Sequence, residues 1–159
     1  MRDLAKLKSA QAAILADQSL QPVKDAAGNI IETHCNFGAE RVAREMGCLE
    51  LDGMVADDQY ATMARNASKL WAKVSGQTAA AHAMAGGLAF AAMTAAQLGD
   101  AHGHIASISP EPMQWSGSLG KDVPMVVNIG RVDTDEKESM AFPVAKGEPS
   151  YFTYDAAGE

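Results

Sequence analysis

Cys35 has the residue type and the position of a nucleophile. It falls in the first turn of an expected helix that Thr33 or His34 caps and Gly47 ends. The apolar residues of that helix recur at i, i+3, i+4 and i+7 and are Ala39, Val42, Ala43 and Met46. Backbone N–H groups at a helix N-terminus favour the thiolate and could stabilise an oxyanion when a carbonyl is attacked. The sequence therefore predicts a solvated, reactive thiol at Cys35.

The second cysteine, Cys48, has the features of a small buried hydrophobe. It follows the end of the same helix and directly precedes Leu49. The same structural interpretation stays open for Cys35, but its polar neighbours favour a functional role. Two cysteines cannot form a disulfide framework.

A thiol nucleophile needs a general base, which the four histidines of the chain could supply. They are His34, His82, His102 and His104. His34 adjoins Cys35, but neighbours in a helical first turn point in different directions. His82 lies in an alanine-rich segment, where a surface or hydrogen-bonded structural histidine is the simplest interpretation. His104 opens a strand-like run that would hold its ring rigidly, so we predict it as the base.

Asn128 is a candidate for orienting the His104 ring. It is the polar residue within the apolar run Val126–Ile129, so it could face His104 from a neighbouring strand. Structural interpretations stay open for both residues. His104 could be a half-buried strand histidine with a backbone partner, and Asn128 a strand-end or bulge residue before Gly130.

Helical patterns dominate the first part of the sequence and strand-like runs the second. Amphipathic or alanine-rich segments predict helices over residues 3–18, 35–46, 57–71 and 77–85, with Asp3, and Asp57 or Asp58, as caps of the first and third. Short runs predict strands over 104–108, 125–129 and 151–154, with a fourth at 140–144. Residues 88–93 could be a buried strand or a helix, and 133–137 are expected to form an exposed turn or loop. This order indicates an α+β fold.

The composition excludes several classes of protein. Apolar residues make up 47% of the 159 residues and charged ones 21%, as in an ordinary globular protein, and we expect one domain over 1–159. The net charge of −7 argues against nucleic acid or an anionic membrane surface as the main partner. The first 20 residues hold no uninterrupted apolar stretch, so neither a signal peptide nor membrane insertion is expected.

Together these motifs resemble a family of enzymes. Thr33–Phe37 opening a helix, Trp71, an alanine-rich segment with Gly86–Gly87, and Gly103–Ile108 are similar to the NlpC/P60 and CHAP-type cysteine peptidases and amidases. These papain-like enzymes cut peptide or amide bonds in bacterial peptidoglycan, and many are phage-encoded or act as antibacterial effectors. The resemblance spans about residues 28–130, within which 109–122 have no counterpart in the pattern.

The resemblance implies Cys35 as nucleophile, His104 as base and Asn128 as the orienting third residue. It implies a papain-like fold with N-terminal helices packed on a small antiparallel sheet that includes residues 88–93. It implies a peptidoglycan substrate and no cofactor or metal ion. An enzyme of this kind would be made in the cytoplasm. It would act in the periplasm or on the cell wall after release through a holin, delivery with a virion, or injection.

Other hypotheses compete with this cysteine hydrolase. His102 and His104, together with Asp100 or His34, could bind a metal ion, because alternate strand residues share a face. The same fold could also serve as a non-catalytic wall-binding or structural module. A fourth hypothesis is an acyltransferase, in which an acceptor other than water takes the acyl group.

Overall fold

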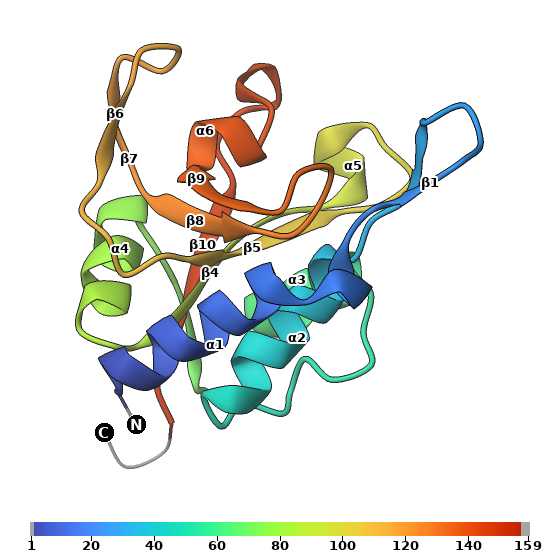
Figure 1. Cartoon of the computed structure of the whole chain (residues 1–159). Helices are drawn as coiled ribbons and strands as arrows, with labels where there is room; N and C mark the ends of the chain where they lie inside the picture. The colour runs from blue at the N-terminus through green and yellow to red at the C-terminus, as the bar shows by residue number, and fades with distance from the viewer. Residues whose placement is uncertain (1, 157–159) are drawn as a thin grey trace.

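Most of the helices lie in the first half of the chain and most of the strands in the second, in a computed structural model that describes residues 2–156 (Figure 1). The helices are α1 (Leu4–Ala16), α2 (Cys35–Glu45), α3 (Ala56–Arg65), α4 (Gly76–Met84), α5 (Ala95–Leu98) and α6 (Glu138–Ala141), with 3-10 turns at Gln18–Leu20 and Val144–Lys146. The strands are β1 (Val23–Lys24), β2 (Ile30–Glu32), β3 (Trp71–Val74), β4 (Leu88–Met93), β5 (His104–Ile108), β6 (Gln114–Ser116), β7 (Lys121–Val123), β8 (Met125–Asn128), β9 (Thr134–Lys137) and β10 (Ser150–Tyr154). The expected α+β class is confirmed.

Six strands form the main sheet, in the order β3-β10-β4-β5-β8-β9. Every neighbouring pair in it is antiparallel. Its third strand, β4, covers residues 88–93, and all six side chains are buried, which explains why this run carries no alternating pattern. The sheet is thus antiparallel, and residues 88–93 form the strand that the resemblance implied.

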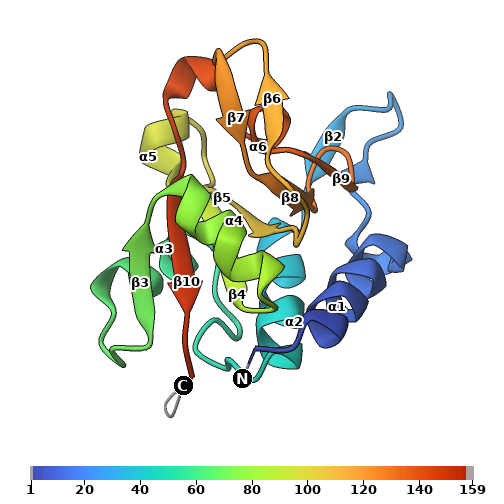
Figure 2. The same ribbon diagram turned by 90° about the vertical axis from the view of Figure 1, so that its left-hand side faces the viewer.

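Helices α1, α2 and α3 lie side by side on one face of the sheet (Figures 1 and 2). Apolar residues of the helices, such as Leu7, Val42 and Met63, are buried in one cluster with Phe90 and Phe152 of the sheet. One polar contact fixes α1 in place: buried Gln11 donates from Nε2 to Ser107 Oγ and to the carbonyl of Ile108, both at 2.8 Å. The helical layer is therefore anchored on β5.

Two expectations for the acidic C-terminal part are wrong. Residues 133–137 do not form a turn; they contain β9, an edge strand, whose free side suits charged residues. Residues 140–144 do not form a strand, because α6 ends at Ala141 and the buried Phe142 anchors the chain before Pro143. Residues 109–122 include β6 and most of β7, whose hairpin extends from the body of the molecule (Figure 2).

The expected helix over 57–71 is shorter than predicted. It ends at Arg65, because Asn66 adopts a left-handed conformation with φ 48°, and Trp71 already opens β3. Its N-cap is Val55, so neither expected aspartate caps it. The cap of α1 is Asp3, as predicted, since its side chain accepts from the N–H of Lys6. Over residues 2–156, none of the helices combines the length and apolar character needed to cross a membrane.

Candidate active site

His104 and Asn128 meet at one end of the main sheet. His104 begins β5 and Asn128 ends the antiparallel neighbour β8, so the two residues come to the same end. His104 Nε2 lies 2.8 Å from Asn128 Oδ1, and the Asn128 side chain is buried. The contact that the sequence predicted between these two residues is present.

The surroundings of His104 favour its neutral form. Its ring packs against that of Phe142, with centroids 5.0 Å apart. Burial lowers the pKa of His104, and the hydrogen bond to Asn128 opposes this effect without cancelling it. Because Nε2 is engaged by Asn128, Nδ1 is the nitrogen that remains for accepting a proton.

Cys35 is the first residue of α2 and contacts the strand that carries His104. The ladder between β5 and β8 ends at Ser107, so the N–H of Ile105 has no partner on β8 and instead faces the Cys35 sulfur. Gly38, one turn further along α2, packs against Ile129, where an added Cβ would lie 2.8 Å from Cγ1. The helix therefore approaches both the strand of His104 and the segment that follows Asn128.

The prediction of a solvated thiolate at Cys35 is wrong. Only 6% of Cys35 is exposed. Burial raises the pKa of its thiol, although the N–H groups of Ile105, Asn36 and Cys35 itself lower it. The cost of desolvating a charged sulfur outweighs the stabilisation that the N–H groups at the helix N-terminus give to a thiolate. The resting side chain is therefore a neutral thiol.

Asp57 fixes the segment that leads into His104. Its carboxylate accepts hydrogen bonds from the N–H of Ala95 at 2.8 Å and of Gly103 at 2.7 Å. A Cβ on residue 103 would lie 2.8 Å from this carboxylate, so glycine permits the contact. Sequence reasoning interpreted Asp57 only as a helix cap and missed this role, because residues 57 and 103 are far apart in the chain.

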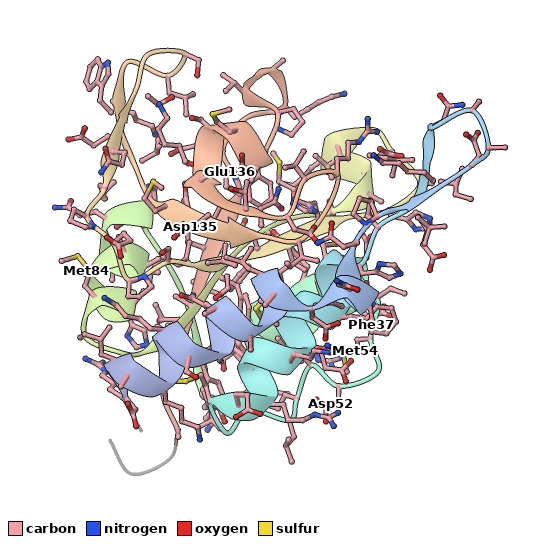
Figure 3. All side chains as sticks on the ribbon, in the orientation of Figure 1. Phe37, Asp52, Met54, Met84, Asp135 and Glu136 are labelled. Carbon is pink, nitrogen blue, oxygen red and sulfur yellow. The ribbon has the colours of Figure 1, made fainter. Side chains whose placement is uncertain are left out.

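A second set of contacts holds the first turn of α2. Asn36, which precedes exposed Phe37, donates from Nδ2 to the carbonyl of Met54 at 3.1 Å (Met54 and Phe37 are labelled in Figure 3). Gln59, fully buried in α3, donates to the carbonyls of Asn36 and Leu51. These contacts come from α3 and the loop before it, and they were not visible in the sequence.

The other histidines have different surroundings. His34 is the N-cap of α2 but makes no capping hydrogen bond, and its nitrogens lie 3.3 Å from the carbonyl of Leu20 and 3.4 Å from Glu32. His82 is buried, with Nε2 3.3 Å from the carbonyl of Tyr154. His102 is exposed.

The metal hypothesis is not supported by the arrangement of side chains. Within residues 2–156, no three His, Cys, Asp or Glu side chains come together in a group that could hold a metal ion. A cavity of about 390 Å³ lies elsewhere, beside the N-terminus of α4 and the β6–β7 hairpin, and Lys121, Glu148 and Tyr151 are among its lining residues. It includes none of the three predicted catalytic residues.

Comparisons with known proteins supply no family for the chain. It matches no model of a known protein family, and no curated protein is similar to it at a significant level. The assignment of roles to Cys35, His104 and Asn128 therefore depends on their chemistry and geometry.

Proposed function

We propose that this protein is a cysteine hydrolase that cuts an amide or peptide bond in bacterial peptidoglycan. The observation that carries the thiol chemistry is the contact of His104 Nε2 with Asn128 Oδ1 at 2.8 Å. The residue after His104 on the same strand is Ile105, whose N–H faces the Cys35 sulfur. A half-buried histidine held in one orientation, on a strand whose backbone contacts a helix-start cysteine, supports an assignment of thiol hydrolysis.

The resting pair is a neutral thiol and a neutral imidazole, because burial raises the pKa of Cys35 and lowers that of His104. In the proposed first step, the Cys35 sulfur attacks the substrate carbonyl while its proton moves to His104 Nδ1. Backbone N–H groups at the start of α2 stabilise the oxyanion that forms. Coupling the proton transfer to the attack avoids a buried thiolate in the free enzyme.

The second half of the reaction reuses the same histidine. The imidazolium gives its proton to the leaving amine as the C–N bond breaks, which leaves a thioester on Cys35. His104 then removes a proton from water, and the resulting attack releases the acid and restores the thiol. Asn128 keeps the ring in place through all of these proton transfers.

The choice of peptidoglycan as substrate is supported by the sequence resemblance described above. The motifs at Thr33–Phe37 and Gly103–Ile108 now fall at the start of α2 and along β5, on an antiparallel sheet covered by helices. We infer the NlpC/P60-like, papain-like architecture from this combination. We also propose that the enzyme acts in the periplasm or on the cell wall after delivery from the cytoplasm.

Mass spectrometry of digested peptidoglycan fragments tests the proposal directly. The purified protein should cut defined muropeptides at one bond, which releases new amino groups and gives fragments of lower mass. The rate of hydrolysis should be the same with and without a chelator. Fragments that bind the protein but keep their mass would instead indicate a wall-binding module. Fragments joined to an added amine in place of water would indicate an acyltransferase.

Expression in bacteria tests the proposed site of action. The protein should accumulate harmlessly in the cytosol and cause lysis when an export signal is attached, with an exported Cys35→Ala variant as control. Equal toxicity of the cytosolic and exported forms would contradict a cell-wall substrate.

A further inference from the structure

The side chain that orients Asn128 is Glu136 of β9. Asn128 Nδ2 lies 2.9 Å from Glu136 Oε1 and 3.3 Å from the carbonyl oxygen of Val132. The amide therefore donates to two acceptors on one side, while its Oδ1 faces His104 on the other. Asn128 links the histidine to a carboxylate of the edge strand.

Strand register brings these three side chains together. Asn128 pairs with Thr134, so Glu136 lies two residues further along β9 on the same face of the sheet. The pairing of Ser107 with Val127 places His104 on that face as well, two residues from the position opposite Asn128. His104, Asn128 and Glu136 thus follow a diagonal across β5, β8 and β9.

The two acceptors allow only one orientation of the Asn128 amide. If the amide were reversed, Oδ1 would face both the Glu136 carboxylate and the Val132 carbonyl, and two acceptor–acceptor contacts would replace two hydrogen bonds. With Oδ1 facing His104, the ring must carry its proton on Nε2, and Nδ1 is left as the base.

We propose that Glu136 is a positioning residue of the active site, which selects the reactive tautomer of His104 through Asn128. This inference rests on the proposed function, because it assigns Glu136 a part in the same reaction. Burial raises the pKa of Glu136, and the hydrogen bond from Asn128 opposes that change by favouring the charged carboxylate. The neighbouring Asp135 lies on the opposite face, where it accepts from Ser109 Oγ at 3.1 Å (both carboxylates are labelled in Figure 3).

Three variants of β9 separate positioning from a general effect on the strand. Glu136→Leu removes the acceptor, Glu136→Gln keeps a carbonyl acceptor of the same shape, and Asp135→Asn removes a charge from the other face. We expect Glu136→Leu to lower kcat about tenfold with little change in KM, since a ring in the wrong tautomer loses its base. Glu136→Gln should recover most of that loss, and Asp135→Asn should match the wild type.

The tautomer of His104 can also be measured by NMR spectroscopy without any substrate. The ¹⁵N shifts of the His104 ring should report a proton on Nε2 in the wild type, in Glu136→Gln and in Asp135→Asn, and a mixture of tautomers in Glu136→Leu. If Glu136→Leu does not fold, Glu136→Met replaces it.

The inference is overturned if a folded Glu136→Leu or Glu136→Met variant keeps both the wild-type kcat and the Nε2–H tautomer. It is also overturned if Glu136→Gln loses activity as fully as Glu136→Leu. A wild-type protein that cleaves no peptidoglycan would overturn the proposed function alone, because the tautomer measurement is independent of turnover.

Discussion

One buried cysteine begins helix α2 and another lies a few residues beyond its end, in different surroundings. Cys35 begins the helix, where N–H groups of Ile105, Asn36 and Cys35 face its sulfur. Cys48 follows the helix, is fully buried, and has Tyr154, Glu50 and Asp52 as neighbours. Burial and these carboxylates raise the pKa of Cys48 to about 11, despite the hydrogen bonds from Glu50 and Tyr154.

Burial alone does not separate the proposed nucleophile from the other cysteine. Burial raises the pKa of both thiols, so neither rests as a thiolate. What distinguishes Cys35 is its contact with the strand that carries His104, since a base that takes the proton during attack makes a low pKa unnecessary. Acidic neighbours disfavour ionisation of both thiols, Asp57 at Cys35 and Glu50 with Asp52 at Cys48, so they do not separate the two.

Replacing His104 should remove the reactivity that we propose for Cys35 at the start of α2. We expect His104→Ala to lower kcat about a thousandfold or more, because the thiol loses both its base and the acid that protonates the leaving amine. Turnover on purified peptidoglycan measures this loss, and His102→Ala, at an exposed position, is the matched control. Comparable losses in the two variants would contradict the role of His104.

Asn128 should matter less than either reacting group. We expect Asn128→Ala to reduce turnover by roughly ten- to a thousandfold, because the ring then samples unproductive orientations. Turnover and melting temperature should be measured on the same sample. A variant that melts lower yet reacts at the wild-type rate would show that Asn128 is only a structural strand-end residue.

Alkylation should distinguish the two thiols directly. Iodoacetamide should modify Cys35 about tenfold faster than Cys48 at neutral pH, because 6% of Cys35 is exposed and its proposed base lies on the strand it contacts, whereas Cys48 is fully buried. Peptide mapping after short exposures measures the two alkylation rates. In His104→Ala the difference between the rates of Cys35 and Cys48 should become smaller. Equal alkylation rates of Cys35 and Cys48 in the wild type would contradict the proposed difference in their reactivity.

The pH dependence of kcat/KM should reflect the half-buried His104. Because burial lowers the pKa of His104, the ring stays neutral, and able to accept a proton, at pH values somewhat below 6.5, the ordinary pKa of histidine. We therefore expect the acid limb to have its midpoint below pH 6.5. Asn128→Ala should shift this limb further down, since the hydrogen bond that raises the pKa is lost. A midpoint above 6.5 in the wild type would contradict the assignment of this limb to His104.

The elements that carry the candidate site could be predicted from local sequence. Helical periodicity predicted the helix that begins at Cys35, and the apolar runs around His104 and Asn128 predicted two strands. The contact between His104 and Asn128 followed from placing polar residues at the ends of such strands. These features depend on residues close together in the chain.

What could not be predicted depends on distant residues. The burial of Cys35 arises from packing of α2 against β5, which a helix-cap pattern does not report. Asp57 looked like a cap but holds Gly103, and Glu136 looked like part of an exposed charged turn but contacts Asn128. In both cases a carboxylate that sequence patterns assign to solvent makes a hydrogen bond across the fold.

The central claim, that Cys35 is a catalytic nucleophile and Cys48 is structural, is tested most directly by the paired variants Cys35→Ala and Cys48→Ala. Hydrolysis of purified peptidoglycan is followed by release of amino groups, and melting temperature is measured alongside. Cys35→Ala should retain no more than a few per cent of wild-type turnover while losing about 1 kcal/mol of stability, and Cys48→Ala should lose stability but keep its activity. A folded Cys35→Ala variant that hydrolyses peptidoglycan at the wild-type rate would contradict the claim.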